Sequence, residues 1–265
     1  MGEDGGTEGF CVSGDVNMKA LITDLDRTLL RTDKTISPYT LDVLRKCREK
    51  GLLLFAATAR PERSILRYQA QVGFDAVTTL NGARIRTQTH SEEYAISPDC
   101  AERIMEKLLQ IPGMMISVET DNGFFASVDR PEWGAAYFTG FPKLPVCGAV
   151  YKILASSEGE LSEREINNVL LKAVYCTTAN RNLFQIMSRN ATKWNGICTI
   201  LRTFGISEDE AVYFGDDHDD LEPIQKCGMG VAVANAVPEV SAKAKWITLS
   251  NDEDGVARFI EENIL

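Results

Sequence analysis

Short apolar runs alternate with amphipathic stretches in the first part of the chain. The runs are rich in β-branched residues and bounded by polar residues, a pattern that predicts buried strands. These runs are 18–24, 52–58 and 76–80. The stretches between them predict helices: one has Ser37 as its N-cap and stops at Gly51, and the other covers 61–73. Alternation of strand and helix predicts a parallel, doubly wound sheet.

The pattern changes between about residues 84 and 188. The runs "ARIRTQT" and "EEYAI" predict a hairpin, and a helix is predicted from Pro98 to Gln110. A second hairpin is predicted around "DNG" at 121–123, a strong turn signal, and a third around "NRN" at 180–182. A further helix ends near Ala173. This segment therefore predicts a separate α+β unit.

The strand–helix alternation returns after Arg189 and continues to the final helix, "GVARFIEENI". We therefore predict an α/β fold. Its core is a doubly wound, Rossmann-like parallel sheet formed by 18–83 and 189–265, with an α+β domain inserted at 84–188 and a mobile tail at 1–17. In such open sheets, ligands bind beyond the carboxyl ends of the strands.

Composition narrows the possible partners. The net charge is −10 and the pI is near 4.9, which argues against a nucleic-acid-binding surface. No run approaches the roughly 18 apolar residues of a membrane span, so no membrane partner is expected. The seven cysteines have no CxxC spacing and predict reduced thiols. Because the N-terminus lacks secretory-signal features, we expect a cytoplasmic protein, with the oligomeric state left open.

Polar side chains follow the predicted strands at the point where each strand ends. Asp24 and Asp26 close the first strand, Thr58 closes the second, and Asn81 follows the third. In the last part of the chain, another predicted strand is followed by Asp216, Asp217, Asp219 and Asp220, and Lys193 opens the helix that leads back into the core. If the sheet is parallel, all of these side chains project into one crevice.

Several carboxylates at close range stay ionised only near a cation. Mg²⁺ prefers oxygen ligands and keeps positions for phosphate oxygens, whereas a His/Cys cluster for zinc is lacking. An aspartate beside Mg²⁺ can attack a phosphoryl group, and Thr58 and Lys193 can hold phosphoryl oxygens. Asp26, two residues after Asp24 on a strand-like backbone, would point the same way and carry the proton. Each group alone is more often turn, cap or surface chemistry; together they predict a phosphoryl-transfer site.

The motifs resemble those of the haloacid dehalogenase superfamily of phosphohydrolases, and within it the Cof-type sugar-phosphate phosphatases with a large α/β cap. The resemblance covers almost all of residues 18–265. The matching motifs are "DLDRTLL" at 24–30, "ATARP" at 57–61, "TLNGA" at 79–83, "ATKWNGI" at 191–197 and "GDDHDDLEP" at 215–223. It implies a small phosphate ester, such as a sugar phosphate, as substrate, and Mg²⁺ as cofactor.

The resemblance also implies individual roles. Asp24 would be the nucleophile and Asp26 the general acid and base. The phosphate- and substrate-binding residues would be Thr58, Ala59, Arg60, Asn81, Lys193 and Asp219. The Mg²⁺ ligands would be Asp24, the backbone carbonyl of Asp26 and Asp216, supported by Asp220. Candidate substrate-selecting residues in the cap are Arg84, Arg86, Tyr137, Lys152 and Arg181, and Arg60 would reach toward the cap.

The sequence departs from the family pattern at Arg27, Ala59, Trp194 and Asp219. Arg27 and Ala59 replace glycines, so an altered loop is expected, and Asp219 adds charge where the family has Asn. Three other interpretations stay open: a phosphomutase-type phosphotransferase, a catalytically weak phosphate-binding relative, and a receiver-like signalling domain. The long separation of Thr58 from Lys193, and the presence of Asp26, argue against the receiver domain.

Overall fold

The computed structural model describes residues 18–144, 148–157, 159, 163–180 and 183–265. The predicted tail at 1–17 lies outside these described residues. Among them, no helix combines the length and the apolar character needed to cross a membrane.

An eight-stranded sheet forms the core, and six of its neighbouring strands are parallel. In spatial order the strands are β14 (Trp246–Thr248), β13 (Met229–Val233), β12 (Ala211–Gly215), β1 (Ala20–Thr23), β2 (Leu53–Ala57), β3 (Ala76–Thr79), β4 (Arg84–Thr87) and β5 (Ser91–Glu93). The chain leaves β1 toward β2 and β3 and later returns to β12 on the other side of β1. This reversal places the expected ligand crevice at the carboxyl ends of β1 and β12.

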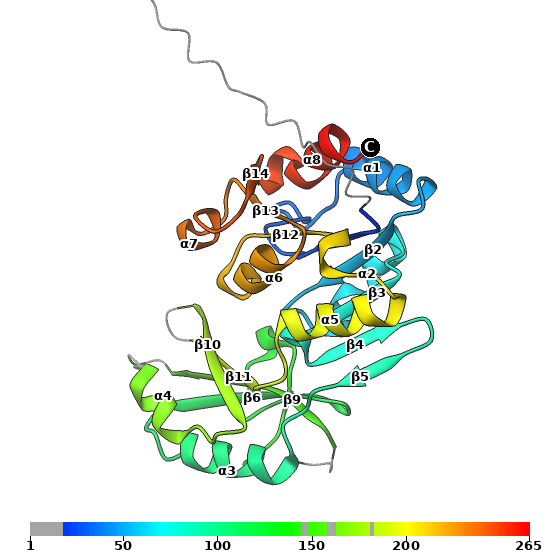
Figure 1. Cartoon of the computed structure of the whole chain (residues 1–265). Helices are drawn as coiled ribbons and strands as arrows, with labels where there is room; N and C mark the ends of the chain where they lie inside the picture. Colours follow the sequence, from blue (N-terminus) through cyan, green and yellow to red (C-terminus); the bar gives the residue numbers. More distant parts are fainter. Residues whose placement is uncertain (1–17, 145–147, 158, 160–162, 181–182) are drawn as a thin grey trace, which may run out of the picture.

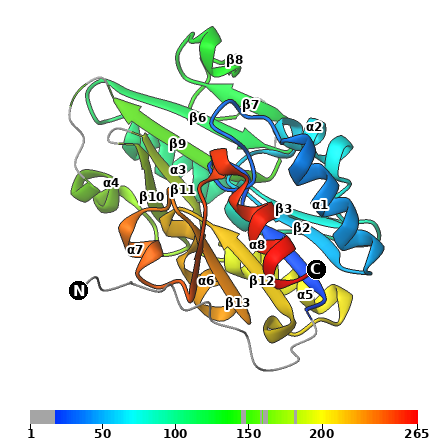
Figure 2. The ribbon, with the colours of Figure 1, turned by 90° about the horizontal axis from the view of Figure 1, so that it is seen from above.

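Helices cover both faces of this sheet, which confirms the predicted doubly wound α/β class (Figure 1). Alternate residues of each strand face opposite sides, so Leu21 packs in one core and Ile22 in the other. One layer contains α1 (Pro38–Glu49), α2 (Glu62–Val72) and α8 (Gly255–Asn263), with α1 packed against the other two (Figure 2). The opposite layer contains α5 (Lys193–Phe204), α6 (Leu221–Lys226) and α7 (Pro238–Ser241).

The predicted ends of the first helix are confirmed. The Ser37 hydroxyl accepts a hydrogen bond from the Thr40 amide at 3.0 Å, and the chain turns at Gly51 with φ +84°. Short 3-10 turns connect several of these elements. They are Leu80–Gly82, Pro131–Trp133, Glu208–Glu210, His218–Asp220 and Asn251–Glu253.

A second sheet of six strands forms the inserted unit. Its spatial order is β10 (Val174–Asn180), β11 (Leu183–Ser188), β9 (Val150–Ser157), β6 (Met114–Thr120), β7 (Gly123–Ala126) and β8 (Ala136–Tyr137). The helices α3 (Pro98–Leu108) and α4 (Glu163–Val169) pack their apolar side chains on one face of it. They lie on the side away from the core (Figure 1). The other face is therefore turned toward the eight-stranded sheet.

The structure differs from the sequence-based description of the inserted segment at two places. The hairpin predicted at its start, β4 and β5, pairs antiparallel with β3 and so extends the core sheet. The connection from β3 to β4 is a single tight turn, which leaves β4 directly beside β3. We therefore propose that the inserted unit begins after Glu93 and not at residue 84. The central strand of its sheet, β9, was not predicted as a strand.

Candidate active site

Four core strands end at one edge of the sheet and present the predicted residues there. Asp24 follows β1, Thr58 follows β2, Asn81 follows β3 and Asp216 follows β12. A cavity of 650 Å³ lies beyond this edge. Of the predicted site residues, those that line it are Asp24, Asp26, Thr58, Ala59, Asn81, Lys193, Asp216 and Asp219. Thus the parallel topology brings residues far apart in sequence to one place.

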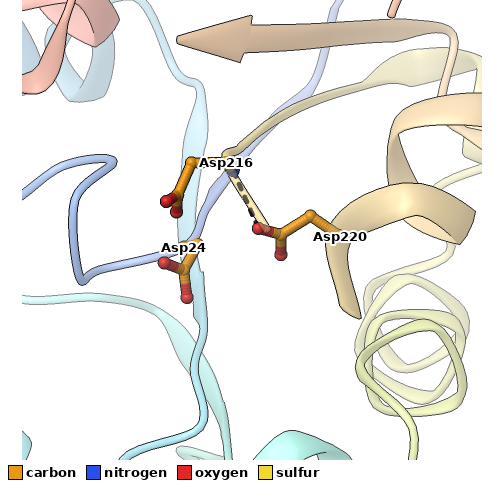
Figure 3. A group of neighbouring side chains, drawn as sticks. All are labelled: Asp24, Asp216 and Asp220. Carbon is orange, nitrogen blue, oxygen red and sulfur yellow. Dashed lines mark hydrogen bonds between the residues drawn. The ribbon is translucent and has the colours of Figure 1, made fainter. Parts of the chain in front are cut away.

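Three buried aspartates form the base of the site. Carboxylate oxygens of Asp24, Asp216 and Asp220 lie within 4.8 Å of one another (Figure 3). One Asp220 oxygen accepts hydrogen bonds from the backbone amides of Asp216 and Asp217 at 2.9 and 3.0 Å. A side chain at Gly215 would lie 2.5 Å from the Asp220 side chain, so this close approach requires glycine.

Lys193, at the start of α5, is the cation of this cluster. Its Nζ lies 2.9 Å from Asp24, 2.6 Å from Asp220 and 3.1 Å from Asp219. It is 3% exposed, yet its three acidic neighbours hold its pKa well above the usual value against the effect of burial. Lys193 therefore remains charged and is fixed beside Asp24.

The cluster carries more negative charge than Lys193 can balance. Burial raises the pKa of Asp24 well above its usual value, despite the opposing effect of Lys193. Burial and the neighbouring Asp220 raise the pKa of Asp216 to about 7. A divalent ion with oxygen preference would relieve this repulsion, and three converging carboxylates are a suitable donor set for it. These residues therefore fit a hard divalent metal ion.

The loop after β1 departs from the expected conformation at Asp26. The chain turns after Thr23 instead of continuing as a strand, so the Asp26 carboxylate does not join Asp24. It accepts two hydrogen bonds from Arg60, at 2.5 and 2.8 Å, and one from Lys34 at 2.7 Å. These hydrogen bonds outweigh burial and lower the pKa of Asp26 to about 2. Arg60 thus binds Asp26, which corrects the expectation that it reaches toward the cap.

Arg27 adopts the backbone conformation that the replaced glycine would favour, with φ +60°. It is held there from both sides: its guanidinium donates to the Asn235 carbonyl at 3.0 Å, and the Asn235 amide donates to the Arg27 carbonyl at 2.8 Å. Thr28, the next residue, donates to Asp216 at 2.9 Å. These contacts fix the loop, and Thr28 orients one carboxylate of the cluster.

The turn after β3 forms the next wall of the site. Leu80, Asn81 and Gly82 all have positive φ, at 52°, 57° and 96°. The Asn81 amide donates to Asp219 at 2.6 Å. Asp219 therefore contacts Asn81 and Lys193 and does not belong to the three-carboxylate group. Thr58 is 1% exposed, and its hydroxyl accepts from the Arg60 amide at 3.2 Å.

The inserted unit closes the cavity with polar groups. Side chains of β10 and β11 that line it are Tyr175, Thr177, Thr178 and Gln185. Sequence reasoning did not single out these four residues. Their position on the two strands of a predicted hairpin was the available signal, but nothing in the sequence shows which face of the hairpin meets the core.

The five cap candidates differ in their placement. Lys152 reaches the core and donates to the Ala59 carbonyl at 3.2 Å and to Asn81 at 2.6 Å. Arg84 and Arg86 lie on β4 and form ion pairs with Glu62 and Glu93. Tyr137 is 53% exposed on β8. Arg181 lies outside the described residues.

Residues 21–260 match the family of haloacid dehalogenase-like hydrolases, and the chain belongs to this family of enzymes. It is 26% identical over 242 residues to the HMP-PP phosphatase of Klebsiella pneumoniae, covering 86% of this chain and 89% of that protein. It is 25% identical over 264 residues to the 5-amino-6-(5-phospho-D-ribitylamino)uracil phosphatase YitU of Bacillus subtilis, covering 90% and 95%.

The fold is shared with solved structures of the same family. A haloacid dehalogenase-like hydrolase from Bacteroides thetaiotaomicron superposes with a TM-score of 0.79 at 22% identity, covering 92% of this chain and 99% of that one. The family predicted from the sequence motifs is therefore confirmed.

Proposed function

We propose that this enzyme is a Mg²⁺-dependent phosphomonoester hydrolase that acts through an aspartyl-phosphate on small phosphorylated metabolites such as sugar phosphates. One observation carries the proposal. Asp24, Asp216 and Lys193 line a 650 Å³ cavity at the carboxyl ends of β1 and β12, with the buried Asp220 carboxylate beside them. This combination suits attack on a phosphoryl group.

Asp24, the backbone carbonyl of Asp26 and Asp216 would hold the metal ion, with Asp220 in support. When bound, Mg²⁺ offsets the charge of the carboxylates and of the phosphoryl oxygens. Lys193 and Thr58 bind phosphoryl oxygens, and Lys193 stabilises the charge that moves in the transition state. Ala59, Arg60, Asn81 and Asp219 complete the surroundings of the phosphate.

The reaction has two steps. An Asp24 oxygen forms a bond to phosphorus as the bond from phosphorus to the ester oxygen breaks, and the leaving oxygen takes a proton from Asp26. Water then attacks the phosphorus and gives a proton to Asp26, while the bond to Asp24 breaks and phosphate leaves. At neutral pH, Asp26 is ionised by its contacts with Arg60 and Lys34. Asp26 can therefore donate a proton only if substrate binding breaks its contacts with Arg60 and Lys34 and lets it take up a proton.

The cavity wall supports a substrate rich in hydroxyl groups. Thr177, Thr178, Tyr175 and Gln185 offer hydroxyls and an amide on the inserted unit, opposite Asp24. Such groups hydrogen-bond to the hydroxyls of a sugar or polyol. The two relatives named above are phosphatases by name, one of HMP-PP and one of 5-amino-6-(5-phospho-D-ribitylamino)uracil.

The test is release of phosphate from p-nitrophenyl phosphate and from a panel of hexose, pentose and nucleotide phosphates. We expect hydrolysis with Mg²⁺, loss of hydrolysis with a chelator, and a loss of at least about a thousandfold in Asp24→Asn. Absence of activity in the wild type, or unchanged activity in Asp24→Asn, would overturn the proposal. Transfer of phosphate to a second sugar hydroxyl would instead identify a phosphomutase-type phosphotransferase.

The pairing of Asp26 favours a second candidate, a catalytically weak phosphate-binding relative. A carboxylate held by two cations is a poor proton donor. This candidate predicts binding of inorganic phosphate with Mg²⁺, measurable by calorimetry, without turnover of any ester in the panel.

A further inference from the structure

Lys152 is a buried cation whose partners belong to both parts of the molecule. It lies on β9 of the inserted unit and is 3% exposed. Its ammonium group donates to the Ala59 carbonyl at 3.2 Å, to Asn81 Oδ1 at 2.6 Å and to Gln185 Oε1 at 2.7 Å. All three ammonium protons thus have an acceptor, and all three acceptors are uncharged.

Asn81 extends this contact to the acidic cluster. Its Nδ2 donates to Asp219 Oδ2 at 2.6 Å, and Asp219 Oδ1 lies 3.1 Å from Lys193 Nζ. A side-chain amide has one accepting end and one donating end, so Lys152 decides which end faces Asp219. An unbroken series of polar contacts therefore runs from the inserted unit to the lysine that holds Asp24.

The charges of the residues along this series also complement one another. Lys193 is in contact with the carboxylates of Asp24, Asp219 and Asp220. A fourth carboxylate, Asp216, lies beside Asp24 and Asp220. Arg27 lies 3.6 Å from Asp216, but more than half of its side chain is exposed to solvent. Lys152 is a second buried ammonium on the Asp219 side of this group. Burial lowers the pKa of Lys152 to about 8, with Asp219 and Glu119 opposing the effect, so it is charged at neutral pH.

We propose that Lys152 is a positioning residue for phosphoryl transfer: it offsets the charge of Asp219 and orients Asn81, and thereby keeps Lys193 directed at Asp24. This inference rests on the proposed function. Since Lys152 belongs to the inserted unit, the phosphate-binding lysine is correctly placed only while that unit is seated on the core.

The test is a double-mutant cycle with Lys152→Met and Asp219→Asn. Met keeps an unbranched side chain only one atom shorter but removes its charge and its donors. We expect Lys152→Met to lower kcat for p-nitrophenyl phosphate at least tenfold and to weaken competitive inhibition by inorganic phosphate. Adding Asp219→Asn removes the uncompensated charge, so we expect the double variant to recover at least fivefold of the lost kcat. Where the Met variant does not fold, Lys152→Gln takes its place with the same expected recovery.

Arg63→Met is the matched control. It also removes a cation that joins core and inserted unit, through Glu119, but it does not contact Asn81 or Asp219. In the double variant of Arg63→Met and Asp219→Asn, we expect the two effects on kcat to multiply, with no recovery of activity. The proposal is overturned if Lys152→Met stays within twofold of the wild-type kcat, or if Asp219→Asn changes kcat by the same factor with and without Lys152.

The phosphate measurement separates this inference from the proposed function. If the wild type hydrolyses no ester, the proposed function fails, and the same cycle is then read from the dissociation constant of inorganic phosphate with Mg²⁺. Recovery of binding in the double variant supports the pairing of Lys152 with Asp219. If Asp219→Asn changes the dissociation constant by the same factor with and without Lys152, the pairing is overturned.

Discussion

At the scale of single residues, two buried lysines keep their charge by different means. Lys193 has three carboxylates around it, and they raise its pKa well above the usual value. Lys152 has only neutral acceptors, and burial lowers its pKa from 10.5 to about 8. Burying Lys152 as an ammonium ion therefore costs stability. For Lys193, ion pairs offset the corresponding cost of its own burial. The two lysines should respond differently to pH.

The pKa of Lys152 predicts a stability that rises in alkaline solution. Between about pH 8 and 10.5 the unfolded chain holds more protons on this lysine than the folded protein does, so its contribution to the free energy of unfolding increases with pH. Compared with Lys152→Met, the wild type should gain about 2 kcal/mol between pH ~7.5 and pH ~9.5. Urea denaturation of both proteins at the two pH values measures this difference. A constant difference would show that Lys152 does not titrate in this range.

At the scale of elements, the site depends on how the turn after β3 meets the start of α5. Leu80, Asn81 and Gly82 are all left-handed, a conformation that costs non-glycine residues of order 1 kcal/mol or more each. A Cβ on Gly82 would lie 2.0 Å from the Thr192 carbonyl oxygen, immediately before Lys193. The turn and the N-terminus of the helix therefore fit together only because residue 82 has no side chain.

Gly82→Ala should separate these two elements. We expect it to lower the free energy of unfolding by more than about 2 kcal/mol, because the added methyl group meets backbone and the φ of +96° is unfavourable for alanine. We also expect kcat to fall at least tenfold, since Lys193 moves with the helix. Gly205→Ala at the other end of α5 is the control: its φ is +66° and its surroundings are open. It should cost about 1 kcal/mol and leave kcat unchanged. Equal losses in both variants would contradict the explanation.

The apolar runs and their polar ends made the core of the molecule predictable. A buried parallel strand must be apolar, and its carboxyl end must face the ligand crevice, so the sequence alone places Asp24, Thr58, Asn81 and Asp216 on one edge of the sheet. The helix ends at Ser37 and Gly51 follow equally local rules.

The errors lie where distant parts of the chain decide the outcome. Asp26 turns away from Asp24 because the loop is held by Asn235, two hundred residues further on, and by Arg60. β9 was missed because Lys152 interrupts its apolar run. Such a lysine breaks the expected pattern of a strand, and only the contact with the core explains why it is buried.

At the scale of the whole molecule, charged contacts help to seat the inserted unit on the core, and two of them are adjacent. Glu119 of β6 and Lys152 of β9 are paired residues on neighbouring strands. Lys152 binds the loops that follow β2 and β3, and Glu119 accepts two hydrogen bonds from Arg63 of α2, both 2.6 Å long. Arg63 also stacks 5.2 Å above Phe124 of β7. The two contacts lie side by side, so loss of the Arg63 contact should loosen the inserted unit next to Lys152.

Arg63→Met tests this seating, because it leaves the Glu119 carboxylate in the interface without its partner. The Glu119 side chain is 7% exposed and that of Arg63 51%, so we expect a cost of about 2 kcal/mol, less than for a fully buried pair. Strands β6 and β7 should exchange their amide hydrogens faster. The KM of a sugar phosphate should rise by about fivefold, equivalent to roughly 1 kcal/mol, while p-nitrophenyl phosphate, which needs fewer cap contacts, should change less.

Neutralising Glu119, the partner of Arg63, tests whether this ion pair seats the inserted unit. Adding Glu119→Gln to Arg63→Met removes the unpaired charge, so the double variant should recover part of the lost stability and slow the exchange of β6 again. Hydrogen exchange followed by mass spectrometry measures both effects on the same strands. If exchange in β6 and β7 is the same in the wild type and in Arg63→Met, the pair with Glu119 does not hold the inserted unit, and the seating depends on the other contacts across the boundary, such as those of Lys152.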